Sequence, residues 1–382
     1  MKKLIFLATA LALYGEVLKE NRLDILDNRA KQIELESKLL KNSWINSVNL
    51  EASLAKSSAL KSEDSIENFS INFLQEIYKS GGIKAIRDSG KIYNRLNQAL
   101  LEREKRELVY QVYGIVLNIK KIDLEIEKTH YLIKNSKIDI KNRKDRYING
   151  LVDMSELDES IIELNSYKNS IEDLKISKNS LLKELKSLSD KNYIDIDIKK
   201  FPLFKLDSFI KQNSDLEIQK LQIESKEIDK KVTKSKYLPK VSLFANYQYE
   251  DSESFKIDKN SHSYGLKLSI PIDFNYKNDI EKSKLEYLIS KLEYREQEDN
   301  QKNLYQNIAK DLKSIESKIE NTKEIIKSYK SLYKMSLELF ENSLKSEDDL
   351  KIVENRVNSN KIDKKIYKID RELLILELYK KI

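Results

Sequence analysis

The chain has 382 residues, of which 35% are charged, and it contains only seven glycines and three prolines. So few chain-breaking residues predict a mainly helical protein with short loops. The 70 Lys and Arg residues are interspersed with 63 Asp and Glu residues, a pattern typical of solvated helix faces that argues against a nucleic-acid partner. Cysteine is absent, which excludes disulfides and thiolate chemistry.

The N-terminus has the pattern of a signal peptide. "MKKLIFLATALALYG" places two lysines before an apolar run of ten residues, and Ala10-Leu11-Ala12 is an A-x-A cleavage site. We therefore expect residues 1–12 to be removed on export, the alternative being the first turns of an ordinary buried helix. No later segment is apolar over about eighteen residues, so the sequence predicts no transmembrane helix.

Two parts of the chain match after a shift of 193 residues, which carries Gly150 onto Ser343. Apolar residues recur every seven positions from Val112 to Tyr147, and the shifted positions, from Tyr305 onward, are apolar as well. A strict seven-residue period predicts left-handed coiled coils. The sequence is therefore interpreted as an internal duplication.

We divide the mature chain into a first repeat at 13–189, a linker at 190–205 and a second repeat at 206–382. Each repeat is predicted to contain a helix, a β-hairpin and a long helical hairpin with a tight tip. The β-hairpins are expected at about 46–77 and about 240–272, where apolar and polar residues alternate. The helix that opens the second repeat is expected to run unbroken from Leu206 to Lys236, and the tips are expected at about 150–155 and 343–348.

Each predicted strand is about ten residues long, the length of a tilted membrane-spanning β-strand. The aromatic residues expected near strand ends, where an interfacial girdle would lie, are Trp44, Phe69, Tyr247, Tyr249 and Tyr264. Four strands are too few to close a barrel, and open sheet edges are not tolerated in lipid. Several chains would therefore have to share one barrel, unless the strands form a small soluble sheet that helices cover.

The turn from the first β-hairpin into the following helix contains Gly81 and Gly82. Glycine permits the positive φ values that an abrupt change of direction requires, although a flexible loop is an equal alternative for these two residues. In the second repeat, "FNYKND" (Phe274–Asp279) is expected to make the same turn with asparagines, which tolerate left-handed geometry.

The first long helix carries a second apolar seam, from Tyr110 to Ile138, offset by two residues from the first. Two residues correspond to about 200° around a helix, so the seams lie on nearly opposite sides. We therefore expect this helix to have a neighbour on each flank, as in a wall or a ring.

Four stretches resemble the TolC family of outer-membrane efflux proteins. In chain order they are "FLQEIYKSGGIKAI", "RYINGLVDMSEL", "KYLPKVSLFANYQY" and "LKLSIPIDFNYKNDIEKSKLEY". The resemblance implies a mainly α fold with a small β part, in which long coiled-coil α-hairpins form a periplasmic tunnel. It also implies a homotrimer, in which four membrane β-strands per chain close a 12-stranded barrel in the lipid of the cell outer membrane.

The same resemblance implies an exit duct of a tripartite efflux or type I secretion system. Such a duct passively conducts substrate that an inner-membrane pump and a periplasmic adaptor protein deliver. The alternatives are a periplasmic adaptor, which has one hairpin and glycine-rich domains, and a soluble structural coiled coil. No enzyme, metal site or cofactor is expected, because His130 and His262 lack a second metal-ligand type at useful spacing and no nucleotide-binding motif is present.

The resemblance places adaptor docking at the two hairpin tips. The residues concerned are Gly150, Leu151, Val152, Ser343 and Leu344.

The second tip also carries Asp348 and Asp349, which the resemblance marks as candidate pore-entrance residues. Relatives often place two aspartates one turn apart there, but Ile352 stands at the second position. The alternative role is helix capping, since Ser346-x-x-Asp349 resembles an N-terminal capping motif. Ser155, three residues before Asp158, is expected to cap its helix in the same way.

Overall fold

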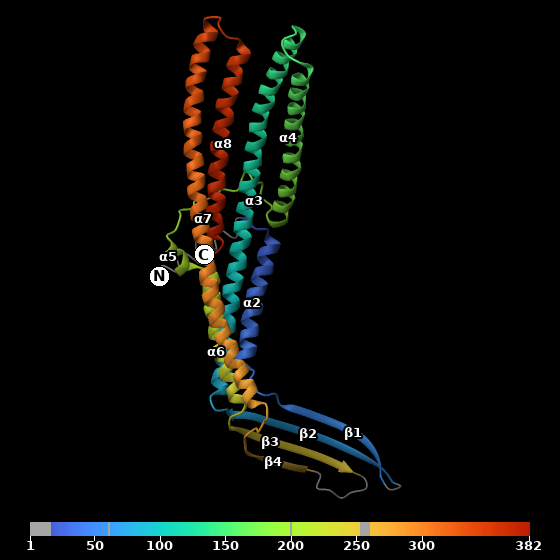
Figure 1. Cartoon of the computed structure of the whole chain (residues 1–382). Helices are drawn as coiled ribbons and strands as arrows, with labels where there is room; N and C mark the ends of the chain where they lie inside the picture. Colours follow the sequence, from blue (N-terminus) through green and yellow to red (C-terminus); the bar gives the residue numbers. More distant parts are fainter. Residues whose placement is uncertain (1–16, 60–61, 199–200, 253–259) are drawn as a thin grey trace. The chain divides into compact units, whose positions relative to one another are not determined.

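A computed structural model describes residues 17–59, 62–198, 201–252 and 260–382; the expected signal peptide at 1–12 lies outside these residues. In chain order the elements are α2 (Glu20–Asn42), β1 (Asn49–Ala59), β2 (Ser62–Tyr78), α3 (Gly82–Ile148), α4 (Met154–Leu188), α5 (Leu206–Gln212), α6 (Ser214–Lys236), β3 (Lys240–Ser252), β4 (Asn260–Ser269), α7 (Tyr276–Glu341) and α8 (Glu347–Tyr379), as Figure 1 shows. None of the helices in the described ranges combines the length and the apolar character that crossing a membrane requires. The predicted fold class, mainly helical with one small sheet, is confirmed.

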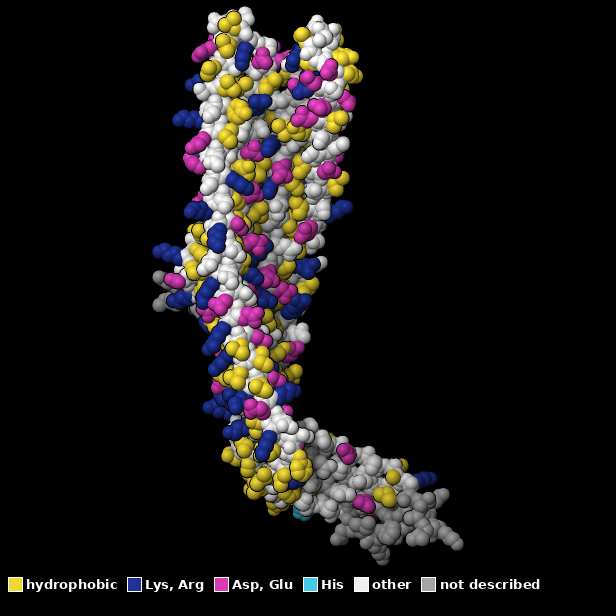
Figure 2. All heavy atoms as spheres, in the orientation of Figure 1, with side chains coloured by type: hydrophobic (Ala, Val, Ile, Leu, Met, Phe, Trp, Pro, Cys, Tyr) yellow, Lys and Arg dark blue, Asp and Glu magenta, His cyan; other side chains and the backbone are white. Residues whose placement is uncertain are grey.

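The chain forms two compact units. The hairpin unit comprises Met1–Leu26, Arg103–Asn213 and Asp299–Ile382, and the sheet unit comprises Asp27–Glu102 and Ser214–Glu298. Helices α3 and α7 are long, and each contributes one stretch to the hairpin unit and another to the sheet unit. Charges of both signs are interspersed along the long helices on the face that Figure 2 shows, as the composition predicted.

In the hairpin unit, the long helices form a layer in the order α4–α3–α8–α7. The side-chain contacts that set this order join Gln111 to Glu184 at 2.9 Å (α3–α4), Lys128 to Asp363 at 2.7 Å (α3–α8) and Lys318 to the ring of Tyr367 at 5.9 Å (α7–α8). Helix α3 therefore has α4 on one flank and α8 on the other. The expectation that its two seams require two neighbours is confirmed.

The core of the hairpin unit lies where the linker meets α3 and α8. Val112, Val116 and Ile119 of α3 are fully buried, and they cluster with Leu376 of α8 and Ile196 of the linker. A second cluster forms around the buried Phe209 of α5. The first apolar seam of α3 thus supplies the centre of this core.

One prediction about the helix that opens the second repeat is wrong. Leu206–Lys236 was expected to be continuous, but the helix breaks at Asn213, whose backbone is extended with ψ 119°. The buried amide of Asn213 donates a hydrogen bond to the side-chain oxygen of Gln301 at 3.1 Å. Because a buried amide requires partners, this distant bond favours the break over a continued helix.

In the sheet unit, the helices form a layer in the order α2–α3–α6–α7. The contacts that set this order join Ser37 to Gly90 at 2.8 Å (α2–α3), Arg95 to Glu224 at 2.9 Å (α3–α6) and Lys226 to Glu286 at 3.0 Å (α6–α7). The sheet has the matching order β1-β2-β3-β4, and all neighbours are antiparallel. Within the described residues, β1 and β4 each pair along one side only.

The strands differ from the sequence-based expectation at their ends. β1 begins at Asn49 rather than at 46, and β2 runs for 17 residues to Tyr78. Phe69, Tyr247 and Tyr264 therefore lie inside their strands, and their expected position near strand ends is wrong. The physical reason is that backbone pairing continues past the apolar stretch into polar residues, which alternation of apolar residues does not mark.

Candidate functional site

The turn between β2 and α3 uses its two glycines for different reasons. Gly81 has φ +86°, in the left-handed region that favours glycine, and the preceding Ser80 has φ +46°. Gly82 begins α3, and a Cβ at this position would lie 2.4 Å from the hydroxyl oxygen of Ser235 on α6. The first glycine therefore allows the change of direction, and the second allows α3 and α6 to approach closely.

The corresponding turn before α7 is built differently. Within the described ranges, Ser80 and Ser343 are the non-glycine residues with positive φ, so the expected left-handed asparagines are wrong. Instead, the Asp273 carboxylate accepts a hydrogen bond from the backbone N–H of Asn275 at 2.7 Å. This turn around an acidic side chain reverses the chain without positive φ. It also leaves Phe274 97% exposed.

The two hairpin tips have the same backbone structure. Gly150 has φ +68° and Ser343 has φ +58°. The paired N–H to carbonyl bonds are Leu151 to Arg146 and Leu344 to Leu339 at 2.8 Å each, and Gly150 to Tyr147 and Ser343 to Phe340 at 2.9 Å each. This pattern is the Schellman motif that ends many helices with a left-handed residue. The serine of the second tip therefore adopts the conformation for which the first tip has glycine.

Both tips expose a leucine. Leu151 is 67% exposed and Leu344 is 72% exposed, whereas Val152 is partly buried. Each leucine directly follows the left-handed residue of its Schellman motif, so the turn geometry projects it outward. The sequence prediction that these residues form matching apolar points at the two tips is consistent with this geometry; docking itself remains a prediction.

The capping role of Asp349 is confirmed. Ser346 accepts a hydrogen bond from the Asp349 N–H at 3.1 Å, and the Asp349 carboxylate accepts one from the Ser346 N–H at 3.3 Å, which completes a capping box. The matching prediction for Ser155 is wrong. Helix α4 already begins at Met154, so Ser155 lies inside the first turn, and Asp153 at the N-cap makes no side-chain capping bond.

Asp348 is engaged in an ion pair with α3. The Lys141 ammonium lies 2.7 Å from its carboxylate, and this hydrogen bond holds the pKa of Asp348 below its ordinary value. Ile352, where the resemblance expected a second acid, instead accepts a hydrogen bond at its carbonyl from Asn135 at 3.4 Å. Both candidate pore-entrance carboxylates thus have partners within the hairpin unit.

The sheet has one apolar and one polar face. Directly opposed residues share a face, and the apolar face contains Leu50, Phe69, Ile71, Phe73, Leu243, Tyr247, Tyr249, Tyr264, Leu266 and Leu268. Leu50, Tyr264, Leu266 and Leu268 are strongly exposed in the single chain, with Tyr264 at 80%, and the other six are less exposed. The opposite face carries mainly Asn, Ser and Gln. An exposed apolar sheet face requires a partner, and the alternation matches strands between lipid and water.

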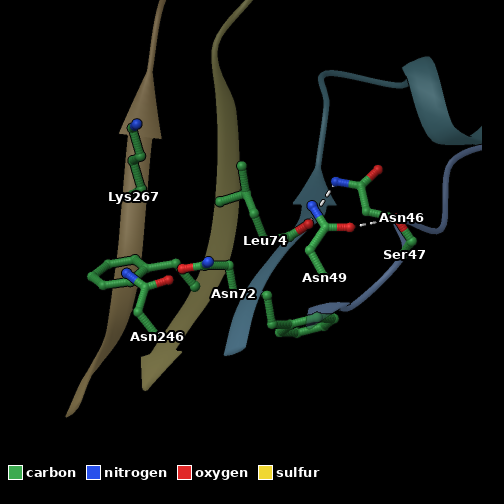
Figure 3. A pocket seen from close by; sticks show the side chains of 9 residues that line it. Asn46, Ser47, Asn49, Asn72, Leu74, Asn246 and Lys267 are labelled. Carbon is green, nitrogen blue, oxygen red and sulfur yellow. Dashed lines mark hydrogen bonds between the residues drawn. The ribbon is translucent and has the colours of Figure 1, made fainter. Parts of the chain in front are cut away.

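The polar face is hollowed near the helix end of the strands. The cavity has a volume of about 660 Å³, and its lining residues on the polar face are Asn49, Asn72, Leu74, Phe244, Asn246 and Lys267. Asn46 and Ser47, before β1, and Phe73, which belongs to the apolar face, complete the lining. Figure 3 shows the asparagines coming from β1, β2, β3 and the segment before β1, with Lys267 on β4. Asn46 anchors the rim through a 2.5 Å hydrogen bond to the carbonyl of Leu74.

Neither histidine belongs to a metal-binding group. His130 on α3 and His262 on β4 are both exposed. Across the described ranges, no cluster of three His, Cys, Asp or Glu side chains is placed to hold a metal ion.

Several solved structures share this architecture at low sequence identity. The outer membrane protein VceC of Vibrio cholerae superposes with a TM-score of 0.76 at 12% identity, and the match covers 98% of this chain and 96% of VceC. The CmeC outer membrane channel of Campylobacter jejuni gives a TM-score of 0.73 at 16% identity, with 98% of this chain and 85% of CmeC covered. The MtrE outer membrane channel of Neisseria gonorrhoeae gives 0.68 at 11%, with 97% and 87% covered.

The chain has the TolC-like fold. No protein-family model and no curated protein matches its sequence. The structural match spans nearly the whole chain, so the TolC-like fold includes the sheet, both hairpins and the linker.

Sequence reasoning missed the apolar residues on the polar face of this TolC-like sheet. Phe244 and Leu74 line the cavity, although their neighbours along each strand on the same face are polar. A usable signal was present, because Phe244 occupies an even position in a strand whose other large apolar residues, from Val241 to Tyr249, are at odd positions.

Proposed function

We propose that this chain is one subunit of an outer-membrane channel-tunnel. It would lie in the cell outer membrane, extend into the periplasm and conduct solutes passively as a homotrimer with a shared 12-stranded barrel. The observation that carries this proposal concerns the edges of the helix layer and of the sheet. Within the described residues, apolar side chains on the outer helices and hydrogen-bonding groups on the outer strands have no partner there. Such edges suit head-to-tail contacts between copies, which close into a ring.

The edges of the sheet unit illustrate this. On α2, Leu35 and Leu39 are exposed and lie two residues on either side of Ser37, which contacts α3. They therefore point away from α3. On α7, an exposed stripe formed by Leu285, Leu288, Ile289 and Leu292 follows helical spacing. In a ring, α7 of one copy would pack on α2 of the next, and β4 would pair with β1.

The assembly is tested with engineered cysteines, since the natural chain has none. Leu35 lies about two turns before the sheet end of α2, and Leu285 lies a similar distance after the start of α7. Oxidation of the Leu35→Cys/Leu285→Cys protein should give a ladder that ends at three chains, and each single variant should not. A product limited to dimers, or a fully folded monomer, would refute the ring.

We further propose that the hairpin tips bind a periplasmic adaptor that links the duct to an inner-membrane pump. Leu151 and Leu344 supply exposed apolar points in matching turns, with Gly150, Val152 and Ser343 shaping them. Asp348 and Asp349 would lie near the pore entrance, held by their ion pair and capping bonds. The periplasmic adaptor and the soluble coiled coil are less well supported, because both leave the exposed apolar sheet face without a role.

The double variant Leu151→Asp/Leu344→Asp tests the docking proposal. It should abolish export and adaptor crosslinking while the trimer melts at an unchanged temperature, because neither leucine belongs to a seven-residue seam. A collapsed trimer would show that the leucines only close the turns. Normal export would reject docking at the tips.

A further inference from the structure

The cavity on the polar face of the sheet is organised in three successive rows across the strands. From the helix end outward, directly opposed residues form a charged row (Glu76, Ser242, Lys267), an apolar row (Leu74, Phe244, Gly265) and an amide row (Asn49, Asn72, Asn246, Ser263). Successive rows are two residues apart along a strand, which corresponds to about 7 Å. The rows thus place three kinds of chemistry within the span of one small molecule.

The apolar row is unusual on a face that otherwise carries mainly Asn, Ser and Gln. Leu74 is 45% exposed, and Phe244 is partly buried. The Phe244 ring rests against Gly265, where a Cβ would lie 3.1 Å from its Cε1 atom. The absence of a side chain at Gly265 therefore lets the ring lie against β4, and the ring still lines the cavity.

The charged row together with the two lysines that pair with its glutamate is net positive. The Glu76 carboxylate is shared by Lys79 at 2.7 Å and Lys240 at 2.9 Å. Lys267 is exposed and has no ion-pair partner within the described residues. Three lysines against one glutamate give +2 at this level. The other acids of the polar face on the paired strands, Glu51, Asp64 and Glu250, lie beyond the amide row, on the side away from Lys267.

The amide row offers hydrogen bonds without charge. Asn49, Asn72 and Asn246 are all exposed, and each has a short polar neighbour that orients it, such as Ser70 at 3.2 Å from the Asn72 amide nitrogen. Figure 3 shows these amides and Lys267 around the same hollow. Convergent amides, one aromatic ring and one free cation are the usual elements of a small-molecule site.

We propose that the three rows form a binding site for an amphipathic organic anion inside the pore. The acidic group of the ligand pairs with Lys267, its aromatic or aliphatic body lies on Phe244 and Leu74, and its polar end meets the amide row. The inference rests on the proposed function, because that function places the polar face toward the conducted solute. It adds the substrate class: organic anions with an apolar body bind at these three rows inside the pore.

The test uses the full-length protein in planar lipid bilayers at pH 7. Two probes with the same naphthalene body and different groups at one end are compared, the anion naphthalene-2-sulfonate and the neutral 2-naphthol. The measured quantity is the residence time of each probe, taken from interruptions of the single-channel current.

The unmodified channel should hold the anion about fivefold longer than the neutral probe, the range of one exposed ion pair. Lys267→Gln should remove that difference. Phe244→Leu should shorten the residence of both probes by about fivefold, because the aromatic contact is lost while the volume is largely kept. Lys56→Gln, which makes the same charge change on the apolar face of β1, should alter neither value.

An unchanged ratio of anion to neutral residence times in Lys267→Gln would overturn the proposal. The proposal would also be overturned if each probe stayed as long in Phe244→Leu as in the unmodified channel. Open-channel conductance equal to that of the unmodified protein shows that each variant is intact. Conductance without probe-dependent interruptions refutes this inference alone. Absence of any conductance in the unmodified protein refutes the proposed channel function and this site with it.

Discussion

The paired tips predict opposite effects of exchanging glycine and serine. Ser343 holds φ +58° and Gly150 holds φ +68°, so the two turns require the same left-handed residue. For a non-glycine residue this conformation costs about 1–2 kcal/mol. Glycine in turn loses about 0.5–1 kcal/mol through the greater freedom of its unfolded chain. Ser343→Gly should therefore stabilise its tip by about 1 kcal/mol, and Gly150→Ser should destabilise the other by a similar amount.

The effect is measured by hydrogen exchange at the tips. The N–H groups of Leu151 and Leu344 close the two Schellman motifs at 2.8 Å, so their exchange reports local opening. A change of about 1 kcal/mol corresponds to about fivefold in the opening equilibrium. Leu344 should exchange about fivefold more slowly in Ser343→Gly, and Leu151 about fivefold faster in Gly150→Ser. Faster exchange of Leu344 in Ser343→Gly would refute the reasoning.

Three further predictions concern local structure. Gly82→Ala should destabilise the sheet unit by about 1–3 kcal/mol in thermal unfolding, since its Cβ would meet α6 at 2.4 Å; unchanged melting would contradict this. Ser346→Ala should cost about 1 kcal/mol of α8 stability by hydrogen exchange, whereas Ser155→Ala should leave α4 unchanged because it makes no cap. Lys141→Gln should return the pKa of Asp348 to its ordinary range by carboxylate NMR. The pair contributes at neutral pH, and its contribution is lost as the pH falls through the lowered pKa; an unchanged pKa in the variant would show that another group sets it.

Periodic features of the sequence predicted the packing of the long helices. The two seams of α3, which begin at Tyr110 and Val112, required a neighbour on each flank, and the structure places α4 and α8 there. A seam records burial averaged over many turns, so it survives local irregularities. The alternation of apolar residues likewise predicted the face shared by Leu243, Tyr247 and Leu266.

Three features of the fold were not predicted: one helix break, one helix start and the length of the strands. The break at Asn213 involves a hydrogen bond to Gln301, 88 residues away; Asn213 also directly precedes α6, and asparagine is a favoured N-cap residue, but this local signal does not by itself require a break. The true start of α4 at Met154 likewise made Ser155 a helix residue instead of a cap. Strand length was underestimated because backbone pairing continues through polar residues such as Ser65.

At the hairpin tips the two halves of the chain reach the same backbone with different residues, whereas the turns that lead into α3 and α7 differ in backbone as well. One tip has glycine and the other has serine in the left-handed position, yet their paired hydrogen bonds have the same lengths, 2.8 and 2.9 Å. The turn into α3 uses Gly81, whereas the turn into α7 uses the Asp273 side chain to reverse the chain. The two tips therefore share the path of the backbone although their residues differ. The residues at the tips need only be compatible with that path. A substitution that adds backbone strain at one tip can therefore be compared directly with the other tip, which has the same backbone structure.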